Sequence, residues 1–225
     1  MSSVGENLKR VQETIDSVLT KIGRTDSVTI IAVTKTQPPE VIEAALKDGI
    51  TTIGENRVQE AFGKHELIGD RAHWHMVGHL QRNKVKQAVQ IFEMIQSIDK
   101  VETATEIDKR VNRPLDVLIE INSSGEDTKS GVAPSDLYRL VDDLLTLNNI
   151  RIRGLMTIGP FTDEQGLIRK AFSLTSKIFD EFAAKYKNLE IDTLSMGMSA
   201  DYAIAVEEGS NMVRLGTILF GARRY

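Results

Sequence analysis

The chain begins with a segment in which apolar residues recur every three or four positions. These apolar positions are Leu8, Val11, Ile15, Leu19 and Ile22. Such spacing places them on one face of an amphipathic helix. Ser3 and Glu6 have the spacing of a capping box at its start, and Gly23 is a typical helix end. We therefore predict that residues 1–26 contain a helix whose apolar face packs on the rest of the chain.

From residue 27 onward, short apolar runs alternate with longer stretches rich in Ala, Glu, Lys, Gln and Leu. The runs predicted as strands are 28–34, 50–54, 73–77, 93–98, 115–121, 150–156, 191–195 and 211–215. The stretches between them, such as PPEVIEAALKDG and APSDLYRLVDDLLTL, have the composition of helices. Because parallel neighbours need crossover connections, this alternation predicts a parallel sheet with helices on its faces.

About eight strand–helix units, with no linker rich in Pro or Ser, favour a closed barrel. We therefore predict an α/β fold, a single (β/α)₈ TIM barrel domain over residues 1–225 with an additional N-terminal helix. The 225 residues lie at the lower end of the usual range for such barrels, about 200 to 400. The alternative is an open, doubly wound sheet. Its glycine-rich fingerprint is not found after the first strand, which runs into TKTQPP.

Composition excludes several classes of protein. The chain has no cysteine, so neither a disulfide framework nor a thiolate zinc site is available. Net charge is −4 and the densest basic stretch, Arg82 to Lys86, is interpreted as a solvated helix start rather than a nucleic-acid footprint. The N-terminus MSSVGENLKRVQETI lacks the apolar core of a signal peptide, and no apolar run approaches a membrane span. We expect a cytoplasmic protein with no membrane or nucleic-acid partner.

Active sites of these barrels lie at the carboxyl ends of the strands, and the first strand ends in AVTKTQP. Ile31, Val33 and Lys35 share one face of that strand. If Ile31 and Val33 fill the interior, Lys35 points into the mouth of the barrel. Partial desolvation there exposes a nucleophilic amine, as Schiff-base formation with an aldehyde requires. The alternative is a solvated loop lysine.

The ends of the last two predicted strands are rich in small and hydroxyl residues. LSMGMS supplies Ser195, Gly197 and Ser199, and RLGT supplies Gly216 and Thr217. Small residues let backbone N–H groups approach an anion, and hydroxyls donate to it. Barrels frequently bind phosphate after strands seven and eight, so these turns are candidate phosphate sites, with ordinary tight turns as the alternative. Arg214 lies between them and shares a face with Gly216.

Other polar residues are weaker candidates. His73, His75 and His79 are close in sequence, but their spacing matches no defined zinc motif, so we predict a structural or cofactor-lining role and no metal. Glu120 shares a face of the fifth strand with Asn122, which makes it an unusual polar candidate for the barrel interior. The sequence assigns no role to Glu120.

Seven segments of the chain resemble, position by position, the pyridoxal phosphate homeostasis protein family, also called the YggS/PROSC family. The segments are AVTKTQP, GENRVQE, HWHMVGHLQRNK, TKSGV, RGLMTI, LSMGMSAD and VRLGTILFGARRY, running from Ala32 to Tyr225. Proteins of this family resemble the barrel domain of alanine racemase, of the fold type III pyridoxal 5′-phosphate (PLP) proteins. They are regarded as carriers or regulators of vitamin B6. The resemblance therefore implies that PLP is the cofactor.

The resemblance also implies which residues contact the cofactor. Lys35 would form the internal aldimine, and Arg214 would face the pyridine nitrogen. The residues expected at the phosphate are Ser199, Gly216 and Thr217, and those expected to line the rest of the cofactor are Asn56 and Met198.

Three functions remain open at this point. The first is a monomeric binding protein that holds PLP and delivers it to PLP-dependent apoenzymes, without strong catalysis. The second is an amino-acid racemase or a related α-carbon enzyme. A racemase needs acid–base groups on both faces of the carbon, yet the sequence ends at Tyr225 directly after the eighth unit. Arg214 would also keep the pyridine nitrogen unprotonated and so weaken the electron sink. The third is a phosphate-binding barrel enzyme without PLP, such as a sugar-phosphate isomerase.

Overall fold

The computed structural model describes residues 3–126 and 130–222, and in these ranges eight strands form one sheet. The strands are β1 (Thr29–Val33), β2 (Thr52–Glu55), β3 (His73–Met76), β4 (Met94–Ile98), β5 (Leu115–Ile121), β6 (Ile150–Thr157), β7 (Thr193–Ser195) and β8 (Met212–Leu215). Each strand is parallel to the next, and β8 pairs with β1, so the sheet closes into a barrel. The predicted (β/α)₈ barrel is confirmed, and the open-sheet alternative is wrong.

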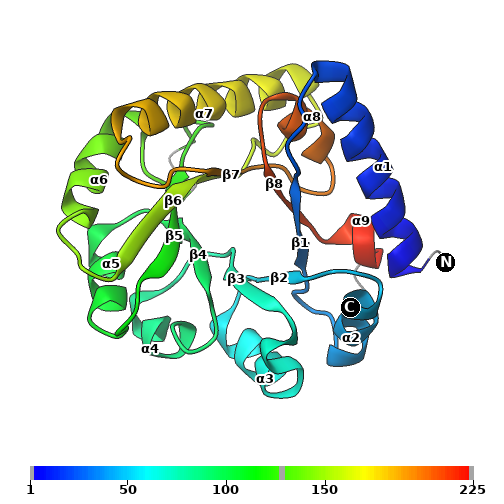
Figure 1. Cartoon of the computed structure of the whole chain (residues 1–225), viewed down its shortest axis with the longest axis horizontal. Helices are drawn as coiled ribbons and strands as arrows, with labels where there is room; N and C mark the ends of the chain where they lie inside the picture. Colours follow the sequence, from blue (N-terminus) through cyan, green and yellow to red (C-terminus); the bar gives the residue numbers. More distant parts are fainter. Residues whose placement is uncertain (1–2, 127–129, 223–225) are drawn as a thin grey trace.

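Helices surround the barrel on the outside, as Figure 1 shows. They are α1 (Val4–Ile22), α2 (Pro39–Lys47), α3 (Val58–Ile68), α4 (Val85–Ala88), α5 (Val101–Asp108), α6 (Leu137–Leu144), α7 (Gln165–Lys185), α8 (Tyr202–Glu207) and α9 (Thr217–Phe220), with short 3₁₀ helices at Gly69–Arg71, Arg82–Lys84 and Pro134–Asp136. One α-helix follows each strand, and α1 is the additional one. Over the described ranges, no helix combines the length and apolar character needed to cross a membrane.

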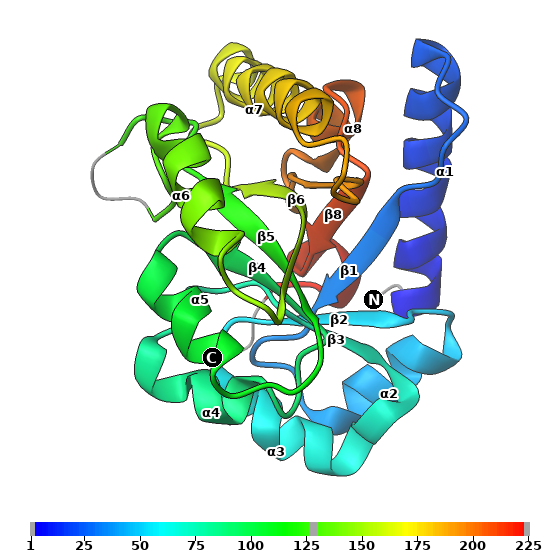
Figure 2. The same cartoon turned by 60° about the vertical axis from the view of Figure 1, so that its left-hand side comes forward.

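Helix α1 has the ends that the sequence predicts. The Ser3 hydroxyl accepts the N–H of Glu6 at 3.1 Å, and the Glu6 carboxylate accepts the N–H of Ser3 at 3.0 Å. Gly23 ends the helix with φ 73°, a left-handed conformation that glycine adopts without strain. The buried face of α1 consists of Val11, Ile15 and Leu19, which pack with apolar residues of α8 and α9. The helix lies outside the barrel on the side of β1 and β8 (Figure 1 and Figure 2).

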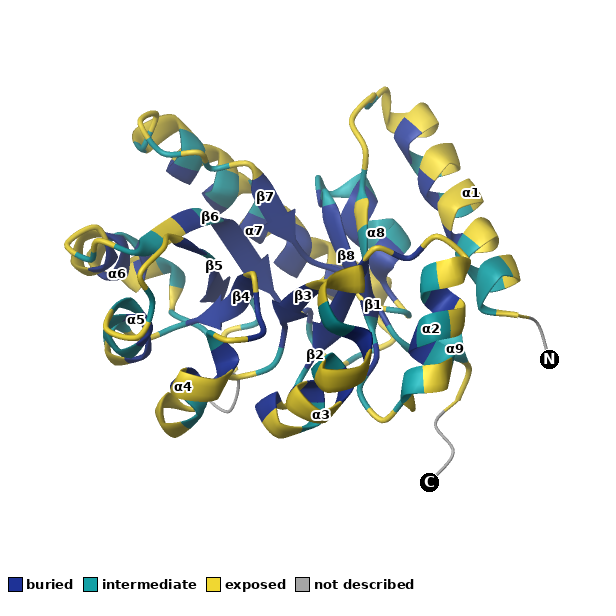
Figure 3. Cartoon of the chain, turned by 60° about the horizontal axis from the view of Figure 1, so that its bottom comes forward, coloured by how far each residue is buried: buried dark blue, intermediate teal, exposed yellow. Residues whose placement is uncertain are grey.

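Alternation along the strands produces two apolar layers. The lumen of the barrel is filled by Ile31, Val77, Met94, Leu118, Met156 and Met212, with Val33 packed against them. Ala32, the residue after Ile31, belongs instead to the layer between the strands and α1. Figure 3 shows the same division, with buried strands at the centre and helices buried only on their inner sides. Side chains at the carboxyl ends of the strands therefore rest on a packed floor.

Strands β6 and β7 approach each other closely at Gly154. Its φ is 152°, and a Cβ built there would lie 1.9 Å from the carbonyl oxygen of Thr193. Only glycine fits this position without moving a strand.

Candidate functional site

Lys35 follows β1 at the carboxyl end of the barrel. Ile31 and Val33 belong to the lumen, so the face on which the sequence places Lys35 is the inner one. Pairing of β1 with β8 brings Lys35 beside the turn that follows β8. Lys35, Gly216 and Thr217 line one small cavity. Its remaining lining residues are Val33, Gln37 and Gly221. The candidate amine and part of the candidate phosphate site thus share a cavity.

The turns after β7 and β8 meet at the hydroxyl of Ser199. The N–H groups of Gly216 and Ile218 both donate to the Ser199 oxygen, at 3.2 Å each. Both N–H groups at the start of α9 are therefore satisfied by this hydroxyl, whose own proton can still be donated. The hydroxyl thus lies at the amino end of α9 as a candidate donor to a phosphate group. Thr217 lies beside them and is exposed.

Arg214 is buried inside the barrel, with 4% of its surface exposed. One guanidinium nitrogen, Nη1, donates to the Ser195 carbonyl at 2.8 Å and to its hydroxyl at 2.6 Å, and Nη2 donates to the Thr157 carbonyl at 2.7 Å. Burial lowers the pKa of Arg214 to about 10, while the negative charges of Glu120 and Asp201 act in the opposite direction. Arg214 therefore remains a cation at neutral pH.

Ser195 continues this contact into a hydrogen-bond chain across the lumen. Its hydroxyl donates to the Gln96 side-chain oxygen at 2.7 Å, and the Gln96 amide donates to Nδ1 of His75 at 3.0 Å. Burial, together with the neighbouring His73, lowers the pKa of His75 to about 4, so the ring is neutral and carries its proton on Nε2. Ser195 thus binds Arg214 in the lumen. The sequence motif LSMGMS groups Ser195 with Ser199 at the candidate phosphate site, and the structure separates the two. Gln96 was not identified from the sequence.

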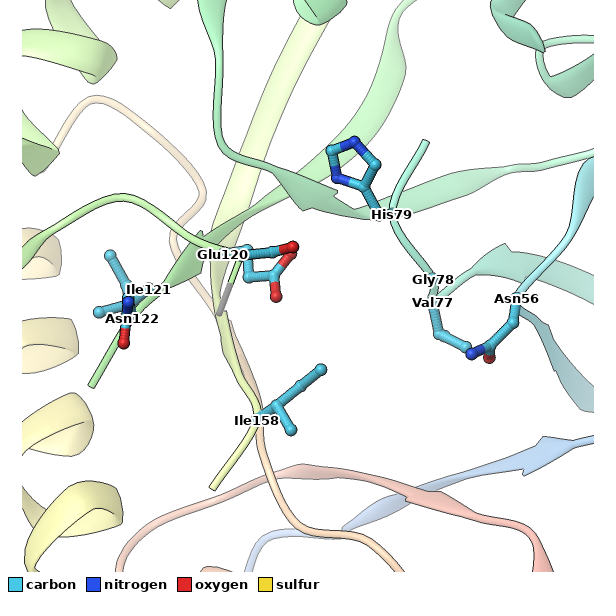
Figure 4. Close-up of a pocket in the computed structure, with 9 residues that line it drawn as sticks. Asn56, Val77, Gly78, His79, Glu120, Ile121, Asn122 and Ile158 are labelled. Atoms are coloured by element: carbon cyan, nitrogen blue, oxygen red, sulfur yellow. The ribbon is translucent and has the colours of Figure 1, made fainter. Parts of the chain in front are cut away.

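A second cavity, of about 220 Å³, opens at the carboxyl ends of β2, β3, β5 and β6. Figure 4 shows Glu120, from β5, and Asn56, which follows β2, on opposite sides of this space. Burial raises the pKa of Glu120 to about 7, the negative charge of Asp99 adds to this rise, and the positive charge of Arg214 opposes it. Glu120 is therefore the polar lumen residue that its strand position predicts, and it can gain or lose a proton near neutral pH.

The structure brings the remaining candidates to the same end of the barrel but not to the cavity of Lys35. Asn56 lines the Glu120 cavity and an adjoining one. Met198 lies in the turn after β7 and is partly exposed, and its N–H donates to the Asp201 carboxylate at 2.5 Å. Two of the segments that carry the family resemblance are described only in part. The residues outside the described ranges are Thr128 and Lys129 of TKSGV and the last three residues of VRLGTILFGARRY.

The three neighbouring histidines occupy different levels of the barrel. His73 is exposed at the start of β3, where Nδ1 lies 2.8 Å from a carboxylate oxygen of Glu93. His75 is in the lumen, and His79 lines the Glu120 cavity. Among residues 3–126 and 130–222, no group of three His, Cys, Asp or Glu side chains could hold a metal ion.

Sequence reasoning also missed a buried ion cluster behind Lys35. Lys64 of α3 contacts the carboxylates of Glu55 and Glu60 at 2.7 Å each. A signal was present, because Glu60 and Lys64 have the i,i+4 spacing of an ion pair, but that spacing is usual on exposed helix faces. Only the fold shows that Lys64 is buried.

Comparison with known proteins places the chain among its relatives. The family model of the alanine racemase N-terminal domain matches residues 7–224. A pyridoxal phosphate homeostasis protein of Aquifex aeolicus (strain VF5) is 42% identical over 225 residues, with 98% of each chain covered. The chain belongs to the pyridoxal phosphate homeostasis protein family.

Solved structures agree with this family. PipY of Synechococcus elongatus PCC7942, with PLP bound, has a TM-score of 0.85 and 32% identity, covering 97% of this chain and 100% of PipY. A crystal structure of an unknown protein from Bifidobacterium adolescentis has a TM-score of 0.91 and 33% identity, covering 96% and 94% of the two chains. The resemblance inferred from the seven sequence segments is therefore confirmed.

Proposed function

We propose that this protein binds PLP through Lys35 and serves vitamin B6 homeostasis as a carrier. The observation that carries the proposal is the single cavity lined by Lys35, Gly216 and Thr217. PLP is an aldehyde and a phosphate ester, so its site needs an amine beside a group of phosphate donors. Lys35 supplies the amine. The phosphate site, here called the phosphate cradle, consists of Ser199, Gly216 and Thr217, so the residues present fit PLP. Relatives named pyridoxal phosphate homeostasis protein, and PipY with PLP bound, support the same cofactor.

Each residue has a distinct part in this proposal. Lys35 would hold the cofactor covalently. The Ser199 hydroxyl, which accepts the Gly216 N–H, would donate its own proton to the phosphate, with Gly216 beside it. Thr217 would add a hydroxyl at the rim, and the Arg214 cation would face the pyridine nitrogen. When bound, PLP supplies a reactive aldehyde and an electron-accepting ring. A guanidinium has no acceptor site, so Arg214 beside that nitrogen would keep it unprotonated and limit α-carbon chemistry.

A PLP enzyme, such as an amino-acid racemase, is the second candidate function. The match to the alanine racemase N-terminal domain favours it, and so does Glu120, whose pKa of about 7 suits an acid–base group. A racemase assay on the PLP-loaded protein distinguishes the two. Turnover that Glu120→Gln abolishes would favour the enzyme, whereas no turnover would favour the carrier.

The carrier proposal extends to the form and partners of the protein. We propose that residues 1–225 act as one PLP-binding domain, that it is a monomer in the cytoplasm, and that it passes PLP to PLP-dependent apoenzymes. A closed barrel leaves no sheet edge to pair with a second copy, which supports the monomer. Light scattering tests this point, and a stable dimer would contradict it.

The covalent lysine is tested by borohydride reduction and peptide mapping of the PLP-loaded protein. We expect one adduct, on Lys35, and a visible absorbance that Lys35→Ala abolishes. The melting temperature of the PLP-free protein should be the same in Lys35→Ala as in wild type. Lys47→Ala, at an exposed position of α2, is the matched control and should retain both signals. An adduct on another lysine would refute the assignment. Phosphate binding with no adduct would favour the sugar-phosphate enzyme.

A further inference from the structure

Three charged side chains form a buried cluster where β2 and α3 meet. The ammonium of Lys64 donates to Glu55 Oε1 and to Glu60 Oε1, each at 2.7 Å. Lys64 is 6% exposed and Glu55 is fully buried, whereas Glu60 keeps some contact with solvent. Burying such a cluster is costly, because each ion loses its hydration.

The cluster contacts the residues on both sides of Lys35. On the N-terminal side, Lys64 Nζ donates to the Thr34 carbonyl at 2.7 Å, and the Thr34 hydroxyl donates to Glu55 Oε1 at 2.6 Å. On the C-terminal side, the N–H of Thr36 donates to Glu60 Oε1 at 2.5 Å. The backbone before and after Lys35 is therefore held by two charge-assisted contacts, at the Thr34 carbonyl and the Thr36 N–H, and the Thr34 side chain adds a third contact through its hydroxyl.

The backbone of Thr36 has a conformation that a threonine does not adopt by itself. Its φ is 66°, and among the described residues it is the one residue other than glycine with a positive φ. A β-branched residue avoids this region and occupies it only where its surroundings impose it. The hydrogen bond from the Thr36 N–H to Glu60 is a contact that imposes this conformation. Without it, the turn after Lys35 is expected to relax and redirect the lysine.

The cluster is not optimised for stability. Glu55 Oε2 is the one buried side-chain nitrogen or oxygen without a hydrogen-bond partner among the described residues. Burial raises the pKa of Glu55, against the effects of Lys64 and Thr34, so ionising Glu55 costs folding energy. Apolar residues of similar volume usually stabilise such a position as well or better. The cluster must therefore be explained by something other than packing.

We propose that Glu55, Glu60 and Lys64 are positioning residues that fix the backbone on both sides of Lys35, so that its amine is presented to the cavity lined by Gly216 and Thr217. The inference rests on the proposed function, because it assigns a role to the cluster only through Lys35. It predicts that loosening the cluster impairs covalent attachment while leaving the phosphate cradle intact.

Glu60 is the residue to vary, since Lys64→Met leaves the buried Glu55 and the partly buried Glu60 without a cation and can prevent folding. Glu60→Ala removes the acceptor of the Thr36 N–H, and Glu60→Gln keeps an acceptor oxygen in its place. Glu43→Ala is the matched control, because Glu43 pairs only with Arg71 on the surface, at 2.9 Å, in the described contacts. All three variants are compared with wild type by melting temperature first.

Two ligands separate attachment from phosphate binding. PLP reports attachment through the rate at which a borohydride-stable adduct forms on Lys35. Pyridoxamine 5′-phosphate has the same phosphate and ring but no aldehyde, so its dissociation constant reports the cradle alone. We expect Glu60→Ala to slow adduct formation by about tenfold or more, a change of about 1.4 kcal/mol in barrier height. Its affinity for pyridoxamine 5′-phosphate should stay within about twofold, a free-energy change well below RT ln 10.

Two variants are controls for this experiment. Glu60→Gln should recover most of the lost rate of adduct formation, and Glu43→Ala should form the adduct at the wild-type rate. A wild-type rate in Glu60→Ala would overturn the positioning role, and so would an equal loss of attachment and pyridoxamine 5′-phosphate binding, which indicates general damage. If wild type itself forms no adduct on Lys35, the proposed function fails and this inference fails with it.

Discussion

Replacing Glu120 by glutamine should change the pH dependence of folding stability. Glu120 is 4% exposed, and burial raises its pKa from an ordinary 4.5 to about 7. An acid with a higher pKa in the folded than in the unfolded chain stabilises the fold when protonated. That contribution is complete at pH values below the pKa of the unfolded chain, and it is lost as pH rises through the pKa of the folded chain. Glutamine has nearly the same shape and does not titrate.

The size of the effect follows from the two pKa values. Each pH unit between them corresponds to about 1.4 kcal/mol, so ionised Glu120 destabilises the fold by up to about 3 kcal/mol. Between pH values near 5 and near 8, wild type should lose about 2–3 kcal/mol more stability than Glu120→Gln. Urea denaturation of both proteins without PLP, at the two pH values, measures this difference directly.

Other titrating groups are common to both proteins and cancel in the comparison. Glu40→Gln, at an exposed position of α2, is the control for removing a carboxylate and should keep the wild-type pH dependence. If Glu120→Gln and wild type lose the same stability from acid to alkaline pH, Glu120 is not held protonated by burial. The assignment of Glu120 as a proton-holding group at the barrel mouth would then be wrong.

Three further predictions concern other parts of the barrel. Burial holds the pKa of His75 near 4, below its ordinary 6.5, so the contribution of His75 to stability should fall by about 2–3 kcal/mol as pH drops between these values; in urea denaturation, wild type should lose that much more stability than His75→Gln over this range. Gly154→Ala should destabilise by about 3 kcal/mol or more in thermal unfolding, because its Cβ would meet the Thr193 carbonyl. In equilibrium dialysis, Ser199→Ala combined with Thr217→Ala should erase at least about tenfold of the preference for PLP over pyridoxal, since a charge-assisted hydrogen bond contributes about 1.5–3 kcal/mol.

The strands were predictable because parallel barrel strands are buried on both faces and read as continuous apolar runs. The predicted run 115–121 coincides with β5, and 28–34 exceeds β1 by one residue at each end. The run 50–54 starts early because Ile50 is buried as well, although it packs in the layer beneath α1 before the strand begins. Burial, rather than sheet pairing, is what the apolar pattern detects.

The candidate site was predictable only in part. The position of Lys35 follows from the two-residue period of β1 and from the floor made by Ile31 and Val33. Contacts across the lumen do not follow from any local period. Gln96 and Ser195 are 99 positions apart, and the stagger of the closed barrel decides that they meet. Lys64 was hidden for the same reason, because its burial depends on a strand and a loop outside its own helix.

The pairing of the first strand with the last has a consequence for biosynthesis. Lys35 leaves the ribosome early, whereas Gly216 and Thr217 are made only after β8, and they reach Lys35 only when β8 closes against β1. A growing chain therefore carries the amine without the anion cradle and cannot assemble the complete site. Under the proposed function, each molecule is made without its cofactor and takes up PLP only after β8 has closed the barrel. The loaded fraction in a cell then depends on the balance between the rate of synthesis and the supply of PLP, so rapid growth on limiting vitamin would leave the newest copies unloaded.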